Sequence, residues 1–86
     1  GRSTLPPKTT PEQADAAVRE ALTDGKNLEM VYVTRDDKHT LTKVAPERLA
    51  INREGLPVLV ARNLDRDERL TYRMSQIERI RTIPVA

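Results

Sequence analysis

The sequence contains no cysteine, which excludes disulfide bonds and thiolate metal sites. It also lacks Phe and Trp, so the core of this 86-residue chain has to be built from aliphatic side chains and two tyrosines. No apolar run is long enough to cross a bilayer, and the N-terminus carries no secretory signal. We therefore expect a cytoplasmic protein that has no membrane partner.

Residues that commonly carry catalysis are scarce as well. His39 is the only histidine, and it lies beside a predicted turn without a second His, a Cys or clustered carboxylates. We expect it to be an exposed turn residue rather than a metal ligand or a member of a catalytic triad. The acidic loop 65–68 lacks the spacing of a calcium-binding loop, and Arg66 and Arg69 can neutralise it. The three glycines are scattered and form no phosphate-binding loop, so the sequence predicts no enzyme, no cofactor and no metal site.

The size and composition of the chain point to one small folded domain. Hydrophobic residues make up 37% and charged residues 33%, which suits a folded domain better than a disordered chain. A domain of this length buries only about 60% of its unfolded surface, which leaves little room for an internal ligand cavity. The net charge is +2, and the charges are unevenly distributed along the chain. Residues 1–42 carry six basic and seven acidic side chains, whereas residues 43–86 carry nine basic and six acidic ones.

The first third of the chain predicts a linker followed by a helix. Residues 1–10 are rich in Pro and Thr and predict a flexible linker, which suggests that the chain is part of a longer protein. Thr10 is a suitable N-cap, Gln13 completes a capping box with it, and Pro11 fits the first helical position. Gly25 fits the left-handed position that ends many helices. The apolar stripe of this helix consists of Ala14, Ala17, Val18, Ala21 and Leu22.

After the helix, apolar residues recur at every second position, and this alternation predicts five short strands. We expect them at residues 27–34, 39–46, 57–62, 69–74 and 79–85. The second strand is expected to end at Pro46, the most apolar one (57–62) to be central, and residues 75–78 to form one helical turn. The pattern predicts a mainly β, α+β fold over residues 11–86, in which the helix caps a strongly bent sheet or small five-stranded, partly closed barrel.

The segment RLTYRM, which begins at Arg69, has the most informative polar pattern. As a strand it turns its apolar residues to one side and Arg69 and Arg73 to the other, about 13 Å apart. Guanidinium groups suit phosphate oxygens. Together with Lys43 on a neighbouring strand they could line a groove for a nucleic-acid backbone, with Tyr32 or Tyr72 stacking on bases. The alternative is that the arginines pair with carboxylates of the same chain, and periodicity alone leaves both possibilities open.

The order of these segments resembles a WYL domain. The correspondence runs from a helix through a strand ending in Tyr, a V-x-P-x-x-L segment, a glycine-led strand and a T-Y-R-M-x-x-I segment, over roughly residues 14–83. The matching positions are Tyr32; Val44, Pro46 and Leu49; Gly55 and Leu59; and Tyr72, Arg73, Met74 and Ile77. The Trp-Tyr pair that gives the family its name is Pro57-Val58 here. The Asp-Arg pair of the last motif is Ser75-Gln76.

The resemblance implies an Sm-like barrel of five strands with an N-terminal helix. WYL domains are accessory modules of bacterial transcription regulators, defence proteins and DNA helicases, and they are thought to bind nucleic acids or nucleotide-like ligands. The expected partners are therefore single-stranded nucleic acid or a nucleotide-like ligand, together with other domains of the parent protein. The residues that would carry binding are Tyr32, Lys43, Arg69 and Arg73. A protein-interaction or structural module without a ligand of its own is the alternative.

Overall fold

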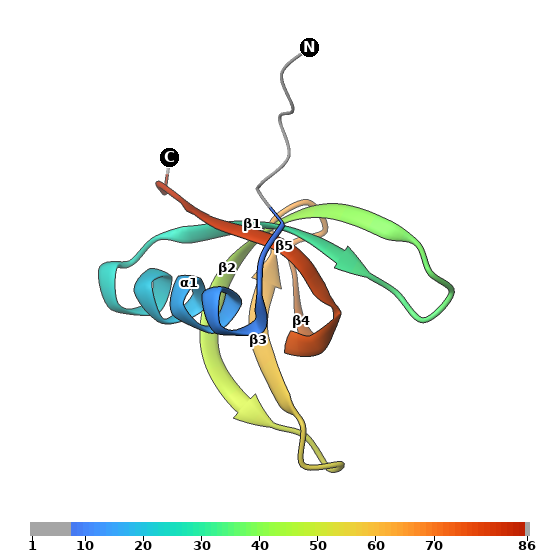
Figure 1. The fold of residues 1–86 in the computed structure, drawn as a ribbon. Helices are drawn as coiled ribbons and strands as arrows, with labels where there is room; N and C mark the ends of the chain where they lie inside the picture. The colour runs from blue at the N-terminus through green and yellow to red at the C-terminus, as the bar shows by residue number, and fades with distance from the viewer. Residues whose placement is uncertain (1–7, 86) are drawn as a thin grey trace.

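The structure is a computed structural model and describes residues 8–85, so most of the predicted linker, residues 1–7, lies outside the described part. One helix and five strands follow one another along the chain (Figure 1). Their bounds are α1 Pro11–Asp24, β1 Asn27–Val33, β2 His39–Ile51, β3 Pro57–Asn63, β4 Glu68–Arg73 and β5 Ile77–Ile83, with a single 3-10 turn, η1 Met74–Gln76, before β5. The predicted helix, five strands and helical turn are confirmed.

Helix α1 begins and ends where the local sequence predicts. The Thr10 hydroxyl accepts a hydrogen bond from the Gln13 amide at 3.2 Å, and the Gln13 side chain accepts one from the Thr10 amide at 3.0 Å. Gly25 follows the helix with φ of 67°, the left-handed conformation that favours glycine. The face turned towards the sheet buries Ala14, Val18 and Ala21. Among residues 8–85 no helix is both long and apolar enough to span a membrane.

The five strands form one antiparallel sheet in the order β4-β3-β2-β1-β5. Strand β2 is central, because its first half pairs with β1 and its second half with β3. The prediction that the apolar strand β3 is central is therefore wrong. The prediction that β2 ends at Pro46 is also wrong, since the strand continues past it with a shift of register between Pro46 and Arg48. The bulge leaves Glu47 outside the ladder and interrupts the pairing next to Pro46, which cannot donate a backbone hydrogen bond.

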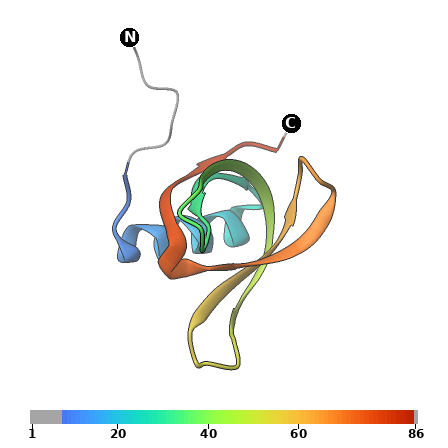
Figure 2. The same ribbon diagram turned by 90° about the vertical axis from the view of Figure 1, so that its right-hand side faces the viewer.

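The sheet curves strongly but does not close. Figure 2 shows the strands as a ring with α1 behind it, and the edges of the sheet are β4 and β5. The seam between these edges is bridged by one side chain of β1. The Tyr32 hydroxyl donates to Gln76 Oε1 and accepts from the Arg73 amide, both at 3.1 Å. The predicted mainly β, α+β class is confirmed, in the form of a bent open sheet rather than a complete barrel.

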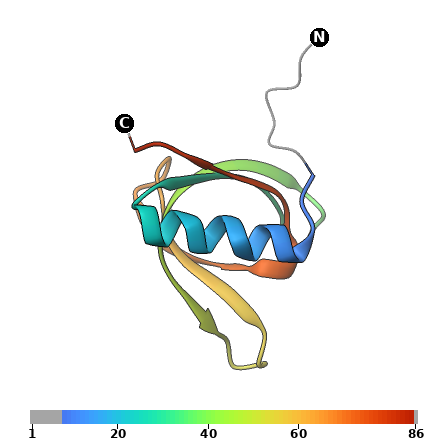
Figure 3. The same ribbon diagram turned by 60° about the vertical axis from the view of Figure 1, so that its left-hand side comes forward.

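The interior of the curved sheet differs between its two ends. At the end that α1 crosses (Figure 3), the largest fully buried side chains are Val18, Leu28, Met30, Val44 and Leu59. Inward-facing residues recur at every second position of a strand. Continuing that alternation, the same strands present Tyr32, Thr42 and Asn63 at the opposite end. The apolar core is therefore confined to the helix side of the sheet.

Two residues before the helix also pair with the sheet. Lys8 forms an antiparallel bridge with Arg79 of β5. The Thr9 amide donates to the Glu78 carbonyl at 3.1 Å, and the Thr9 hydroxyl accepts from the Ile80 amide at 3.0 Å. These residues belong to the segment for which the sequence predicts a linker, and they cover part of the outer edge of β5.

Candidate nucleic-acid interface

The outer side of β2, β3 and β4 gathers arginine side chains from three strands. In β4 the predicted alternation holds, because Leu70 and Tyr72 pack against the core while Arg69 and Arg73 lie on the other side. Arg62 of β3 is directly opposite Arg69 in the antiparallel ladder, so the two share that side. We call this cluster the arginine face, and its members are Arg48, Arg62, Arg69 and Arg73.

Each of the two arginines predicted from RLTYRM contacts a carboxylate. Arg69 Nε lies 2.9 Å from Glu47 Oε1, and Arg73 Nη2 lies 2.9 Å from Glu54 Oε1. Of the two possibilities that the sequence leaves open for these arginines, the structure shows the pairing with carboxylates of the same chain. The bulge of β2 supplies Glu47 and the β2–β3 turn supplies Glu54, which lie 22 and 19 residues away in sequence. Strand alternation in β4 carries no information about such distant partners.

The ion pairs on the arginine face are largely open to solvent. One member of each pair is well exposed, Arg69 at 63% and Glu54 at 61%. Their partners are about one-third exposed, Glu47 at 32% and Arg73 at 31%. Arg62 pairs with Asp67 at 3.0 Å, and Arg48 makes no ion pair within residues 8–85. Exposed pairs of this kind contribute only about 0–1 kcal/mol each. The face thus carries four guanidinium groups against three carboxylates.

Two valines are buried beneath the arginine face. Val58 is 3% exposed and Val60 is 7% exposed, although both lie on the outer side of β3. Arg73 is directly opposite Val58, and Arg48 is directly opposite Val60. Arginine side chains commonly lay their aliphatic stems over apolar surface while the charged end stays in water. This explains why residues 57–61 of β3 are all apolar although β3 is not the central strand.

Lys43 borders the arginine face on the side of β1. It is exposed, and it lies two residues before Ala45, which is directly opposite Arg62. Its own neighbour across the ladder is Glu29, which is already engaged because Glu29 Oε1 accepts from Arg81 Nε at 2.8 Å. Lys43 makes no ion pair with the described residues, so its ammonium group is available to an anion.

Tyr32 is separated from the arginines by the sheet itself. Its ring packs edge-to-face against Tyr72, with centroids 5.1 Å apart and an interplanar angle of 80°. Its hydroxyl is engaged at the seam described above, where Gln76 in turn donates to the Val33 carbonyl at 3.0 Å. The structure therefore brings Arg69 and Arg73 together and places Lys43 at their margin, while Tyr32 faces the interior.

The polar end of the interior forms an open cavity of about 340 Å³, which we call the mouth pocket. Its lining includes Tyr32, Thr40, Thr42, Asn63, Arg66 and Tyr72. Asn63 Nδ2 donates to the Tyr72 hydroxyl at 3.1 Å. Burial raises the pKa of Tyr72 above its usual value of 10.0, and the hydrogen bond from Asn63 only partly offsets this.

Sequence reasoning missed the mouth pocket, because a chain of this size was expected to leave little room for a cavity. The cavity is possible because it opens to solvent instead of lying inside the small core. One signal was present in the second strand, where Thr40 and Thr42 alternate in step with the buried Val44. Polar residues at inward positions of a small barrel leave space that apolar side chains would otherwise fill.

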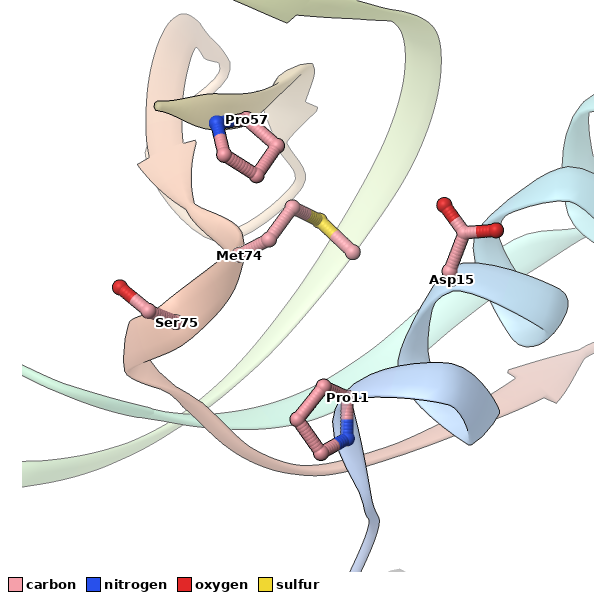
Figure 4. A pocket seen from close by; sticks show the side chains of 5 residues that line it. All are labelled: Pro11, Asp15, Pro57, Met74 and Ser75. Atoms are coloured by element: carbon pink, nitrogen blue, oxygen red, sulfur yellow. The ribbon is translucent and has the colours of Figure 1, made fainter. Parts of the chain in front are cut away.

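A second hollow lies on the helix side of the molecule. It has a volume of about 210 Å³ between the start of α1 and the start of β3, and is lined by Pro11, Asp15, Pro57, Met74 and Ser75 (Figure 4). Its lining contains no cationic side chain and one carboxylate. The charge of this hollow is therefore unsuitable for a phosphate-bearing ligand.

The remaining polar candidates, His39 and the acidic loop 65–68, make ion pairs with neighbouring side chains. His39 is exposed at the start of β2, and its Nδ1 lies 2.6 Å from Glu78 Oε2. In the acidic loop, Asp67 contacts Arg62, and Glu68 contacts Arg66 at 3.2 Å. Within residues 8–85 no group of three or more His, Cys, Asp or Glu side chains is arranged to hold a metal ion.

The fold and the arginine face define a small domain with one helix, one bent β-sheet and a cationic outer surface. The family model of the WYL domain matches residues 14–82, and the chain belongs to this family. Proteasome accessory factor B/C (PafBC) of Arthrobacter aurescens has a similar structure, with a TM-score of 0.78 at 21% sequence identity. The match covers 95% of this chain and 13% of the PafBC chain, and at this identity it shows a shared fold. No curated protein sequence matches the chain.

Proposed function

We propose that this WYL domain is a non-catalytic accessory domain that binds single-stranded nucleic acid or a nucleotide-like ligand. The observation that carries the proposal is the arginine face, where four guanidinium groups from three strands share one side of the sheet. Guanidinium forks bind phosphate oxygens through paired, charge-assisted hydrogen bonds. In the proposed complex Arg69 and Arg73 contact different phosphates of the same nucleic-acid strand, and Lys43 extends the contact along it.

The parent protein in this proposal is a larger bacterial protein that acts on DNA, such as a helicase or a transcription regulator, and it works in the cytoplasm. Two observations support an accessory role. The chain belongs to the WYL family, and the segment similar to it makes up only 13% of the PafBC chain. A domain of this kind would leave catalysis to other parts of the parent protein.

The carboxylates on the arginine face set the expected strength of binding. A phosphate has to displace Glu47 from Arg69 and Glu54 from Arg73, because both guanidinium groups are already paired. Each displaced pair is exposed and contributes about 0–1 kcal/mol, so the cost of exchange is small. Binding is therefore expected to be moderate at low salt and to weaken steeply as salt is added.

The test is a fluorescence-anisotropy titration of the 86-residue chain with a labelled single-stranded DNA across a series of salt concentrations. Substituting Arg69→Ala and Arg73→Ala together should reduce the slope of log affinity against log salt by about 1.4, since each neutralised phosphate contributes about 0.7. The matched control is the pair Arg19→Ala and Lys26→Ala, which removes the same charge from two ion-paired positions in and just after α1. A wild-type chain that shows no binding at low salt would reject the proposal.

A protein-interaction module is the second candidate, and exposed apolar residues favour it. Ile51 is 67% exposed and Leu56 is 40% exposed, and both lie near the β2–β3 turn. Ile51 lines a hollow of about 180 Å³ beside the helix, together with Leu49 and Pro57. If nucleic acid does not bind, replacing Ile51 with Ser and measuring association with the rest of the parent protein tests this candidate directly.

A further inference from the structure

The mouth pocket is a second polar site, on the opposite side of the sheet from the arginine face. The inward row of β2 runs from Thr40 through Thr42 to Val44, yet only Val44 belongs to the apolar core cluster. Inward positions of small barrels are normally filled by apolar side chains that interdigitate. A local departure from this pattern without a gain in packing is typical of a functional site.

Two hydroxyl groups that line the mouth pocket have unused hydrogen-bonding capacity. Thr42 is 5% exposed, and its hydroxyl makes no hydrogen bond with the described residues. Tyr72 is 6% exposed; its oxygen accepts from Asn63, but its own proton has no acceptor within residues 8–85. Both residues line the open mouth pocket, so their hydroxyls are available to a polar ligand that enters it.

A cationic side chain stands at the rim of the same pocket. Asn63 Oδ1 accepts hydrogen bonds from the backbone amides of Asp65 and Arg66, each at 3.0 Å, and so fixes the turn that carries Arg66. The Arg66 side chain is 65% exposed and pairs only with Glu68, at 3.2 Å. Asn63 thus connects the interior hydroxyl of Tyr72 to the position of the guanidinium group at the rim.

We propose that the mouth pocket receives the base of a nucleotide while Arg66 contacts its phosphate. A base edge carries both donors and acceptors, and the Thr42 and Tyr72 hydroxyls can serve either kind. The rings of Tyr32 and Tyr72 supply an aromatic wall, which suits a planar heterocycle. The volume of about 340 Å³ lies at the lower end of the range of about 300–1,000 Å³ found for small-molecule sites.

This assignment rests on the proposed function for the choice of a nucleotide, but it uses different residues. The base enters from the open end of the sheet, whereas Arg69 and Arg73 lie on its outer side. The nucleotide has two possible sources, a free mononucleotide or an unstacked nucleotide of a single strand. Both present a base with a phosphate a few ångströms away, and the experiment separates them.

The experiment follows backbone amide NMR signals of the chain during titration with the four ribonucleoside 5′-monophosphates, the nucleosides and ribose 5-phosphate. Expected are saturable shifts around Thr42, Asn63 and Tyr72 with nucleotides and weaker ones with nucleosides. Ribose 5-phosphate should leave these signals in place. Equal shifts with ribose 5-phosphate, or nucleotide shifts confined to the arginine face, overturn the proposal.

Substitutions then identify the contacts. Thr42→Val keeps the shape of the side chain but removes its hydroxyl, and should weaken nucleotide binding about tenfold. The matched control is Thr23→Val on the exposed surface of α1, which should change nothing. Arg66→Ala should weaken binding of the nucleotide but not binding of the nucleoside. Unchanged nucleotide affinity in Thr42→Val contradicts the assignment. The NMR spectrum of each variant has to show that the variant is folded, so that a change in affinity reports on the pocket.

Oligonucleotides distinguish this proposal from the one for the arginine face. An abasic strand should bind the arginine face without shifting Thr42, and a base-bearing strand should shift both regions if the pocket accepts a nucleotide of a strand. Shifts of Thr42 with mononucleotides alone identify a free nucleotide as the ligand. The double substitution of Arg69 and Arg73 should abolish binding of the abasic strand and leave mononucleotide binding intact, so failure at one site does not imply failure at the other.

Discussion

The two ends of the curved sheet are built from the same strands but differ in their chemistry. Under α1, β1 contributes Met30 and β3 contributes Leu59, and neither is exposed to solvent. Further along the same strands the inward positions hold Tyr32 and Asn63. Apolar burial is the main source of folding stability, whereas polar groups in an open cavity add little to it. The comparison separates an end that stabilises the fold from an end that is free to bind.

The largest effect should come from removing a side chain at the helix end. Leu59→Ala creates a cavity in the core and is expected to lower the free energy of unfolding by about 2–5 kcal/mol. Thr42→Val, which lies on the same sheet at the other end, should leave it unchanged or raise it slightly, because an unpaired buried hydroxyl is replaced by a methyl group. Urea unfolding followed by circular dichroism measures both. Equal destabilisation by the two substitutions would contradict the division of the interior into two ends.

An intermediate effect is expected at Tyr72, where the two ends meet. Its pKa in the folded chain lies above the usual 10.0, so the unfolded chain loses this proton at a lower pH than the folded chain does. The contribution to stability is complete below pH 10 and is lost as the pH rises from 10 through the folded pKa. Tyr72→Phe should remove this part of the loss of stability above pH 10. It should also lower stability at neutral pH by about 1–2 kcal/mol, because Asn63 loses its hydrogen-bond acceptor.

The measurement for Tyr72 is a set of urea unfolding curves of the wild-type chain and of Tyr72→Phe at several pH values on both sides of pH 10. The difference between the two proteins isolates the contribution of this one phenol from that of the lysines. A constant difference across the whole pH range would show that burial does not perturb this group.

The smallest effect sharpens the contrast between the inner and outer sides of the sheet. Replacing Glu47 and Glu54 with Gln removes the carboxylates that compete for Arg69 and Arg73, and should raise the affinity for single-stranded DNA by about threefold per pair. Binding of a mononucleotide in the mouth pocket should not change. Anisotropy titrations at one salt concentration measure the gain.

The control for this gain is Glu20→Gln with Asp24→Asn, which changes the net charge equally from the second half of α1. If this control strengthens binding as much as the substitutions on the arginine face do, the effect is one of overall charge, and the two ion pairs do not restrict access to the arginines.

Elements whose signals are local could be predicted from the sequence. Thr10 and Gln13 form the predicted capping box, Gly25 takes the predicted left-handed conformation, and β4 shows the predicted alternation. Each of these features is decided by residues within one turn or one strand. The order of segments also identified the WYL family, although the Trp-Tyr pair is replaced by Pro57 and Val58.

Features that depend on distant residues could not be predicted in the same way. The path of β2 through Pro46 depends on a bulge against β3, and proline by itself signals only the end of a strand. The pairing of Arg69 with Glu47 spans 22 residues and depends on that same bulge. Val58 is an apolar residue that is buried because the neighbouring arginine side chains cover it on the outer side of the sheet. From the sequence alone, such an apolar residue suggests that its strand lies at the centre of the sheet.

The hydroxyl of Tyr32 joins the two edges of the sheet at the backbone of Arg73, and this contact has a mechanical consequence. Tyr72 and Arg73 are consecutive in the chain, one forming a wall of the mouth pocket and the other carrying a cation on the outer side. The hydrogen bond from the Arg73 amide to Tyr32 adds to the pairing with β3 in holding the end of β4, and the ring of Tyr32 packs against that of Tyr72. A movement of the Tyr72 ring inside the sheet would therefore also displace the backbone of Arg73, whose guanidinium group lies on the outer side.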